Sequence, residues 1–163
     1  MNIRLATPKD EKEISILISL FRAELKRLKG TESAPDIERA KVDFREYVSA
    51  KYPIFVAEDG EGKVNAYLVC KIIDDVVWVE SLFVSEQERR KGIATSLYHE
   101  AEKLAQELGA LTLYNWIHPN NDKMISFLSR LGYDVLNLIE VRKKLNNEVT
   151  TGTVKVGDHK YNY

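Results

Sequence analysis

The chain has 163 residues, a length typical of one folded domain. Its net charge of −1 gives it no overall attraction to nucleic acid or to an anionic membrane surface. Hydrophobic residues make up 44% and charged residues 30% of the sequence, as in proteins with an apolar core and a charged surface. No run is long enough to cross a bilayer, and the first residues show no signal-peptide pattern. The single cysteine, Cys70, lies in an apolar run, so we expect an inert core thiol and a cytoplasmic protein.

The first third of the chain predicts a strand followed by two amphipathic helices. Residues 3–6 favour a short strand, and Thr7-Pro8 then supplies a capping residue and a proline suited to the first helical position. That helix ends at Gly30, and a second helix runs from Pro35 to just before Pro53. The predicted apolar stripes of the two helices are Ile14, Leu17, Phe21, Leu25 and Leu28, and Ile37, Ala40, Phe44 and Val48.

Three antiparallel strands are predicted next. Their sequences are rich in β-branched and aromatic residues and cover Ile54–Glu58, Lys63–Ile73 and Val76–Val84. The connections, Asp59–Gly62 and Asp74-Asp75, are short and typical of hairpin turns.

The rest of the chain alternates helices with strands. A helix over residues 93–108 leads to a strand over 111–117, which should run parallel to the strand over 76–84 because a helix connects the two. The remaining predicted elements are a helix over 121–131, a long strand over 133–145 and a terminal hairpin over 151–163.

The segment Arg89–Ala94, between a predicted strand and a predicted helix, is the strongest functional signal. A glycine turn that opens a helix presents unpaired backbone N–H groups and the positive end of the helix dipole. Three cations precede Gly92, so the segment predicts a site for a phosphate-bearing ligand. The competing interpretation is a solvated basic turn before an ordinary helix.

This segment resembles motif A of the GNAT N-acetyltransferases, Arg/Gln-x-x-Gly-x-Gly/Ala, which Arg89, Gly92 and Ala94 match. Farther along, Asn121 begins a predicted helix that closes at Leu131-Gly132-Tyr133, similar to the family's Asn…Gly-Phe/Tyr motif B. A strand also lies at the family's usual distance upstream of motif A.

The resemblance covers about residues 3–145 and implies an α/β (α+β) fold. In the GNAT fold a central mixed, mostly antiparallel sheet has a splayed fourth and fifth strand and about four flanking helices. We expect a GNAT domain over residues 1–145, with residues 146–163 as a C-terminal hairpin extension of it. Dimerisation is common in the family, but the sequence leaves a homodimer open.

The resemblance also implies acetyl-CoA as cosubstrate. Backbone groups of the fourth strand would pair with the pantetheine arm, and N–H groups of the glycine turn would hold the pyrophosphate. Asn121 has two compatible roles, as a helix cap and as a partner of the arm. The predicted cofactor-binding residues are Leu82, Phe83, Val84, Arg89, Arg90, Lys91, Gly92, Ile93, Ala94, Thr95 and Asn121.

Glu80 is the candidate catalytic residue. Strand periodicity places it on a face with the apolar residues Val76, Trp78, Leu82 and Val84. A partly desolvated carboxylate there suits a general base that deprotonates an ammonium substrate, and similar family members carry a glutamate at this position. The alternative is a glutamate that faces solvent or pairs with a cation.

One position departs from the family pattern. A tyrosine that protonates the departing CoA thiolate is common seven residues after the motif B asparagine, whereas this chain has Leu128. Tyr98, Tyr114 and Tyr133 are conceivable substitutes, although each also fits a packed or surface aromatic. The histidines have no partner at a metal-ligand spacing, so we expect no metal. His118, just after the strand over 111–117, is a second candidate for proton transfer, and the alternative is a plain loop histidine.

Three functions therefore stay open. The first is an acetyl-CoA-dependent N-acetyltransferase that moves acetyl directly to a primary amine, on a small molecule or a peptide. The second is a CoA-binding sensor with weak or no catalysis, because of Leu128. The third is a partner-binding module whose terminal hairpin adds a strand to another chain. The predicted acceptor wall, residues 21–48, mixes acids and bases and does not name the amine.

Overall fold

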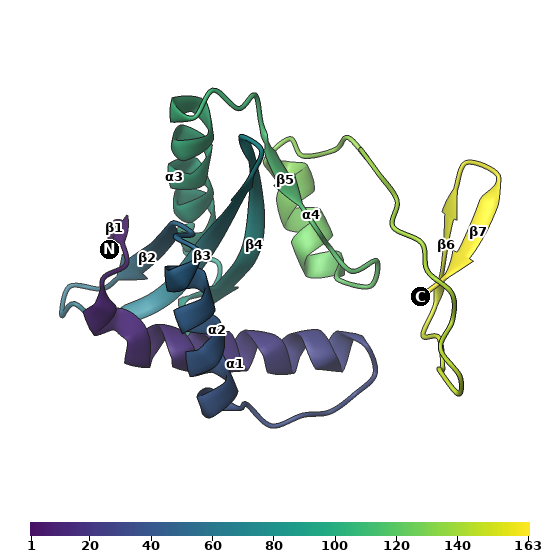
Figure 1. Cartoon of the computed structure of the whole chain (residues 1–163), viewed down its shortest axis with the longest axis horizontal. Coiled ribbons are helices and arrows are strands. Elements are labelled where there is room, and N and C mark those ends of the chain that lie inside the picture. The colour runs from purple at the N-terminus through teal and green to yellow at the C-terminus, as the bar shows by residue number, and fades with distance from the viewer. The chain divides into compact units, whose positions relative to one another are not determined.

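The computed structural model describes all residues, 1–163 (Figure 1). The chain forms two compact units, the first made of residues 1–27 and 32–116 and the second of residues 28–31 and 117–163. The expected domain over residues 1–145 therefore stays a prediction. No helix is long and apolar enough to span a bilayer.

The first unit contains a five-stranded sheet in the order β1-β2-β3-β4-β5. Every neighbouring pair is antiparallel except β4 and β5, which are parallel. This confirms the predicted mixed, mostly antiparallel sheet. The strand bounds are β1 Asn2–Leu5, β2 Ile54–Glu58, β3 Val64–Ile73, β4 Val76–Val84 and β5 Leu113–Asn115.

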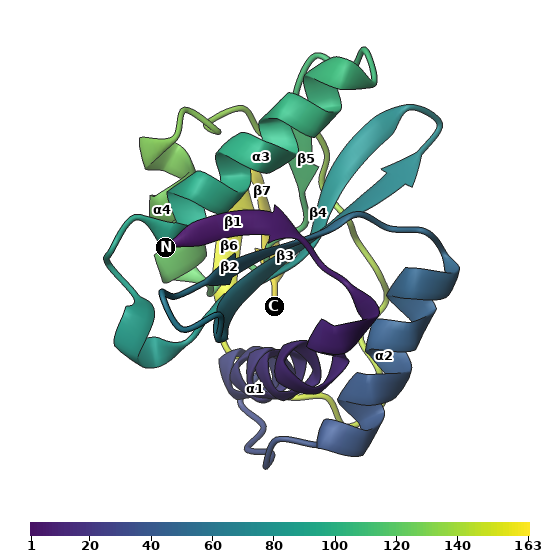
Figure 2. The same ribbon diagram turned by 90° about the vertical axis from the view of Figure 1, so that its left-hand side faces the viewer.

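Helices cover both faces of this sheet. Helices α1 (Glu11–Leu28) and α2 (Ile37–Ser49) lie on one face, and α3 (Ile93–Glu107) lies on the other (Figure 2). The core under α1 and α2 joins these helices to β2, β3 and β4, and its strand residues include Val56, Tyr67 and Phe83. The sheet therefore has a distinct α1/α2 face and α3 face.

The predicted stripe of α2 is wrong at its edges. Ile37 and Val48 are exposed, whereas Asp43 is buried and Tyr47 packs against the core. The true stripe is shifted toward Asp43 and Tyr47 because the helix turns a face containing both charged and aromatic side chains inward. Hydrophobicity alone could not detect that rotation.

Cys70 is fully buried in β3, as expected. Burial raises the pKa of its thiol to about 12, so the thiolate that would react is suppressed.

The second unit contains α4 (Asp122–Arg130) and a two-stranded sheet of β6 (Thr153–Val156) and β7 (His159–Asn162). Helix α4 ends in a Schellman motif, in which the N–H groups of Gly132 and Tyr133 bond to the carbonyls of Ser129 and Leu128. The terminal hairpin confirms the sequence prediction.

The long strand predicted over residues 133–145 is absent. This segment forms no ladder, and its large apolar side chains are exposed, with Val135 at 86% and Leu138 at 77%. A strand exists only where its backbone groups pair with a neighbour, so an apolar pattern is not sufficient. The prediction was wrong because it considered the segment without a partner.

Candidate active site

The parallel pairing of β4 with β5 ends part-way along β4. The last matched residues are Val79 and Asn115, while β4 continues to Val84. Beyond Val79, the backbone groups of β4 that point toward β5 have no strand partner. An extended ligand can pair with such an open edge in the manner of an added strand.

Glu80 lies at the point where this open edge begins, and it is the extra residue of a β-bulge. Val79 pairs with Cys70 and Ser81 pairs with Val69, so Glu80 has no opposite residue on β3. The bulge turns Glu80 and Ser81 toward the same α1/α2 face, because Val69 belongs to the core on that face.

The bulge corrects one detail of the sequence prediction. Glu80 was expected to share a face with Leu82 and Val84, but these pair with Leu68 and Ala66, on the α3 face. Simple alternation fails here because an extra residue shifts the strand period by one. Glu80 is nevertheless half-buried, as a residue on a partly apolar face should be.

Aromatic and hydroxyl groups that the sequence did not single out lie on the same α1/α2 face as Glu80. The Tyr67 hydroxyl and Ser81 Oγ are 2.6 Å apart in the buried core. Burial, followed by the nearby negative charge of Glu80, raises the pKa of the Tyr47 phenol to about 12. Glu80 and Tyr47 are thus electrostatic neighbours, although they come from β4 and α2.

A buried carboxylate connects the two helices on this face. Asp43, only 1% exposed, pairs with the Nε atoms of Arg22 and Arg39, the latter 3.3 Å away. Neither Asp43 oxygen has a hydrogen bond of good geometry, so charge attraction to the two guanidiniums offsets much of its desolvation. No sequence spacing relates Arg22 on α1 to Asp43 on α2.

The glycine turn has the backbone that its sequence predicts. Gly92 has φ 81°, in the left-handed region that glycine tolerates best, and nothing lies within 4 Å of where a Cβ would be. The first backbone bond of α3 runs from the Ser96 N–H to the Gly92 carbonyl at 3.0 Å. The N–H groups of Ile93, Ala94 and Thr95 therefore have no partner within the helix.

The three cations before this turn differ in their contacts. The Arg89 guanidinium contacts Glu24 at 2.7 Å and donates to the Val84 carbonyl at 2.9 Å. Lys91 pairs with Glu88 at 3.0 Å, whereas Arg90 is exposed and forms no ion pair. Arg89 therefore holds the turn against α1 and the end of β4, and Arg90 is the cation most available to a ligand.

The motif B residues lie in the second unit. Asn121 Oδ1 accepts the Met124 N–H at 3.2 Å, which confirms the helix cap. Leu128 is buried at 3% exposure and acts as a packing residue. His118 Nδ1 contacts the side chain of Asn120, so its ring is already engaged.

The suggested tyrosine substitutes for a general acid have other structural contacts. The Tyr98 hydroxyl, fully buried, donates to Asn115 Oδ1 at 2.7 Å. Tyr114 packs against Trp78 with ring centroids 5.0 Å apart. No group of three or more His, Cys, Asp or Glu side chains is placed to hold a metal ion.

Residues 17–133, which include β4, the glycine turn and α4, match the sequence profile described as the acetyltransferase (GNAT) family. The chain belongs to this family. The matched span includes Glu80 and Gly92, and so both the open edge of β4 and the glycine turn.

Individual relatives are more distant. A Bacillus subtilis (strain 168) protein, YwnH, named provisionally a phosphinothricin acetyltransferase, is 21% identical over 139 residues, which cover 82% of this chain and 83% of that protein. The solved BH1408 protein from Bacillus halodurans is 20% identical with a TM-score of 0.70, covering 89% of this chain and all of that one. The aminoglycoside acetyltransferase AAC(6')-Iy, solved with a CoA bisubstrate analogue, is 20% identical with a TM-score of 0.66, covering 88% and 98%.

Proposed function

We propose that this GNAT protein transfers acetyl from acetyl-CoA directly to a primary amine, with Glu80 as general base. The observation that carries the proposal is the β-bulge, which places Glu80 where the open edge of β4 begins. The proposed general base and the proposed cofactor-binding edge then lie on the same strand, β4. The relatives named for phosphinothricin and aminoglycoside acetylation support an amine acceptor.

The chain's own groups suit both parts of the cofactor. The backbone of Leu82, which alternation directs away from β3, can pair with the amide-containing pantetheine arm, whereas the backbone groups of Phe83 are directed at β3. The unpaired N–H groups at Gly92–Thr95 and the α3 dipole can hold the pyrophosphate, with Arg90 adding charge. Val84 is a weaker partner for the arm, because its carbonyl already accepts from Arg89.

In the proposed reaction, Glu80 takes a proton from the acceptor ammonium, directly or through a water, and so frees the nitrogen lone pair. The nitrogen then bonds to the acetyl carbon, the carbon–sulfur bond breaks, and CoA leaves as a thiolate. No nucleophile paired with a base lies beside Glu80, which favours direct transfer over an acyl-enzyme. The thiolate takes its proton from solvent, because Leu128 cannot donate one.

The direct test is the Glu80→Gln variant. We expect acetyl-CoA binding by calorimetry to match the unaltered chain, while thiol release over an amine panel falls by about 10²-fold or more. Glu61→Gln, in the exposed turn between β2 and β3, is the matched control and should keep full activity. Equal turnover in Glu80→Gln would remove Glu80 as the base, and binding without thiol release from any amine would favour the sensor function.

A further inference from the structure

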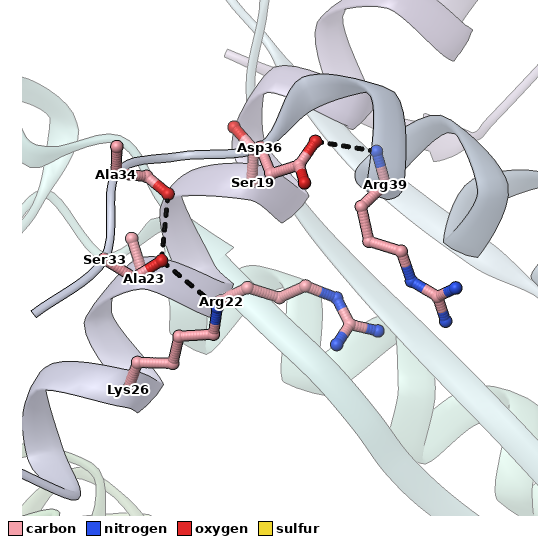
Figure 3. A pocket seen from close by; sticks show the side chains of 8 residues that line it. All are labelled: Ser19, Arg22, Ala23, Lys26, Ser33, Ala34, Asp36 and Arg39. Atoms are coloured by element: carbon pink, nitrogen blue, oxygen red, sulfur yellow. Dashed lines mark hydrogen bonds between the residues drawn. The ribbon is translucent and has the colours of Figure 1, made fainter. Parts of the chain in front are cut away.

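A hollow of about 240 Å³ lies between α1 and the start of α2, within the first unit (Figure 3). Three cationic side chains extend along it, Arg22 and Lys26 from α1 and Arg39 from α2 (Figure 3). We call it the basic hollow. Its lining residues are Ser19, Arg22, Ala23, Lys26, Ser33, Ala34, Asp36 and Arg39.

Three of the acids near the basic hollow have hydrogen-bond or ion-pair partners. Glu24 pairs with Arg89 at 2.7 Å, and Asp36 caps α2 by accepting the Arg39 N–H at 2.9 Å. Asp43 is buried beneath the arginines and shared between them. Among the residues that line the hollow, three cations therefore accompany a single carboxylate, that of Asp36.

Donor groups remain unused on all three cations. Arg22 and Arg39 meet Asp43 through Nε, and their side chains are 44% and 56% exposed. Lys26 Nζ donates to the Ser33 hydroxyl at 3.1 Å and has no carboxylate partner. A guanidinium held through Nε still presents its terminal N–H groups, which suit the oxygens of a carboxylate or phosphonate.

The basic hollow and the proposed catalytic base lie on the same side of the sheet, the α1/α2 face. Contacts lead from one to the other: Arg22 pairs with Asp43, and Tyr47, one turn later on α2, packs against the core that contains Tyr67. The Tyr67 hydroxyl is 2.6 Å from Oγ of Ser81, the residue that follows Glu80. An acceptor whose amine reaches Glu80 can therefore extend toward Arg22.

We propose that the acceptor is a small amine that also carries an anion, a carboxylate or phosphonate, and that Arg22, Lys26 and Arg39 bind this anion. The inference rests on the proposed function and narrows it from any primary amine to zwitterionic ones. Asp43 positions the two arginines rather than touching the acceptor.

The test uses matched acceptors in the thiol-release assay with the full chain. Free amino acids and aminoalkylphosphonates are compared with their methyl esters, which keep the amine but lose or reduce the negative charge. We expect kcat/KM to be about tenfold or more higher for the anionic member of each pair, because hydrogen bonds to charged groups are the stronger kind.

Two variants locate the effect. Lys26→Gln and Arg39→Gln should each raise KM for the anionic acceptor about tenfold, with kcat little changed and no rise in KM for the ester. The matched controls are Lys41→Gln and Arg45→Gln, which are on α2, pair with Glu38 and Glu11, and do not line the basic hollow. A merely structural role would alter both acceptors equally.

The outcomes separate the two proposals. Equal kcat/KM for anionic and esterified amines, or variants that affect both alike, would overturn the anion site and leave the acetyltransferase intact. No thiol release from any amine would overturn the proposed function, and this inference with it.

Discussion

The glycine turn and the basic hollow, the two proposed binding regions, are built in opposite ways. The turn is local: Gly92 and the residues after it offer backbone N–H groups in one short segment. The hollow is assembled from side chains of α1 and α2 and depends on Asp43 to hold Arg22 and Arg39. A backbone site is set by local sequence, whereas a side-chain site requires the tertiary fold.

The largest effect should come from breaking the side-chain region. Asp43→Asn removes the buried charge that Arg22 and Arg39 share, and we expect about 2 kcal/mol lower unfolding free energy, less than for a fully buried pair because both arginines are partly exposed. Urea denaturation measures the change, and KM for the acceptor should rise as well. Unchanged stability together with unchanged KM would show that Asp43 does not hold Arg22 and Arg39 in place.

Disrupting the glycine turn should instead lower the affinity for acetyl-CoA. Gly92→Val forces a β-branched residue to φ 81°, a conformation that strains the turn whose N–H groups follow it. We expect the affinity for acetyl-CoA to fall by about 1–2 kcal/mol, roughly tenfold, by calorimetry. Gly62→Val, at φ 81° in the turn between β2 and β3, is the control for strain alone, and should leave the affinity unchanged. Equal losses in both would remove the turn from the cofactor site.

A third change lies outside both regions. The hydrogen bonds from Arg4 lower the pKa of the buried Asp10 carboxyl from its ordinary 3.8 to about 2. Asp10 therefore stabilises the fold above its unfolded pKa, and this contribution is lost as the pH falls from about 4 to about 2. Asp10→Asn should cost about 1–2 kcal/mol at neutral pH, discounted because Arg4 is 30% exposed, and should flatten the loss of stability below pH 4. We expect the affinity for acetyl-CoA to stay the same, and a change in that affinity would contradict a role for Asp10 in stability alone.

The smallest expected effect is that of removing the exposed cation Arg90 from the glycine turn. Arg90→Gln removes an exposed cation without an ion pair, so we expect only a few-fold loss of CoA affinity that shrinks as salt is added. Lys103→Gln, on α3 after the turn and paired with Glu100, should show no loss. A loss from Arg90→Gln that is insensitive to salt would argue against a charge contact with phosphate.

The sequence predicted what depends on neighbouring residues. The bounds of β2 and β4, the two-residue turn at Asp74-Asp75 and the glycine turn at Gly92 all follow from local propensity and backbone freedom. The cap at Asn121 belongs to the same class.

What depends on distant partners was not predictable. The bulge at Glu80 appears only when β4 is aligned with β3, and the charge sharing at Asp43 appears only when α1 meets α2. Residues 133–145 show the converse, an apolar strand pattern that the structure leaves unpaired. The role of Glu80 and the cofactor contacts remain predictions.

The most direct measurement of the central claim is a crystal structure of the chain with CoA. The account predicts that the pantetheine arm lies along the open edge of β4 with its sulfur near Glu80, and that the pyrophosphate contacts the N–H groups at Gly92–Thr95. CoA bound away from β4, or with its sulfur far from Glu80, would contradict the proposed active site.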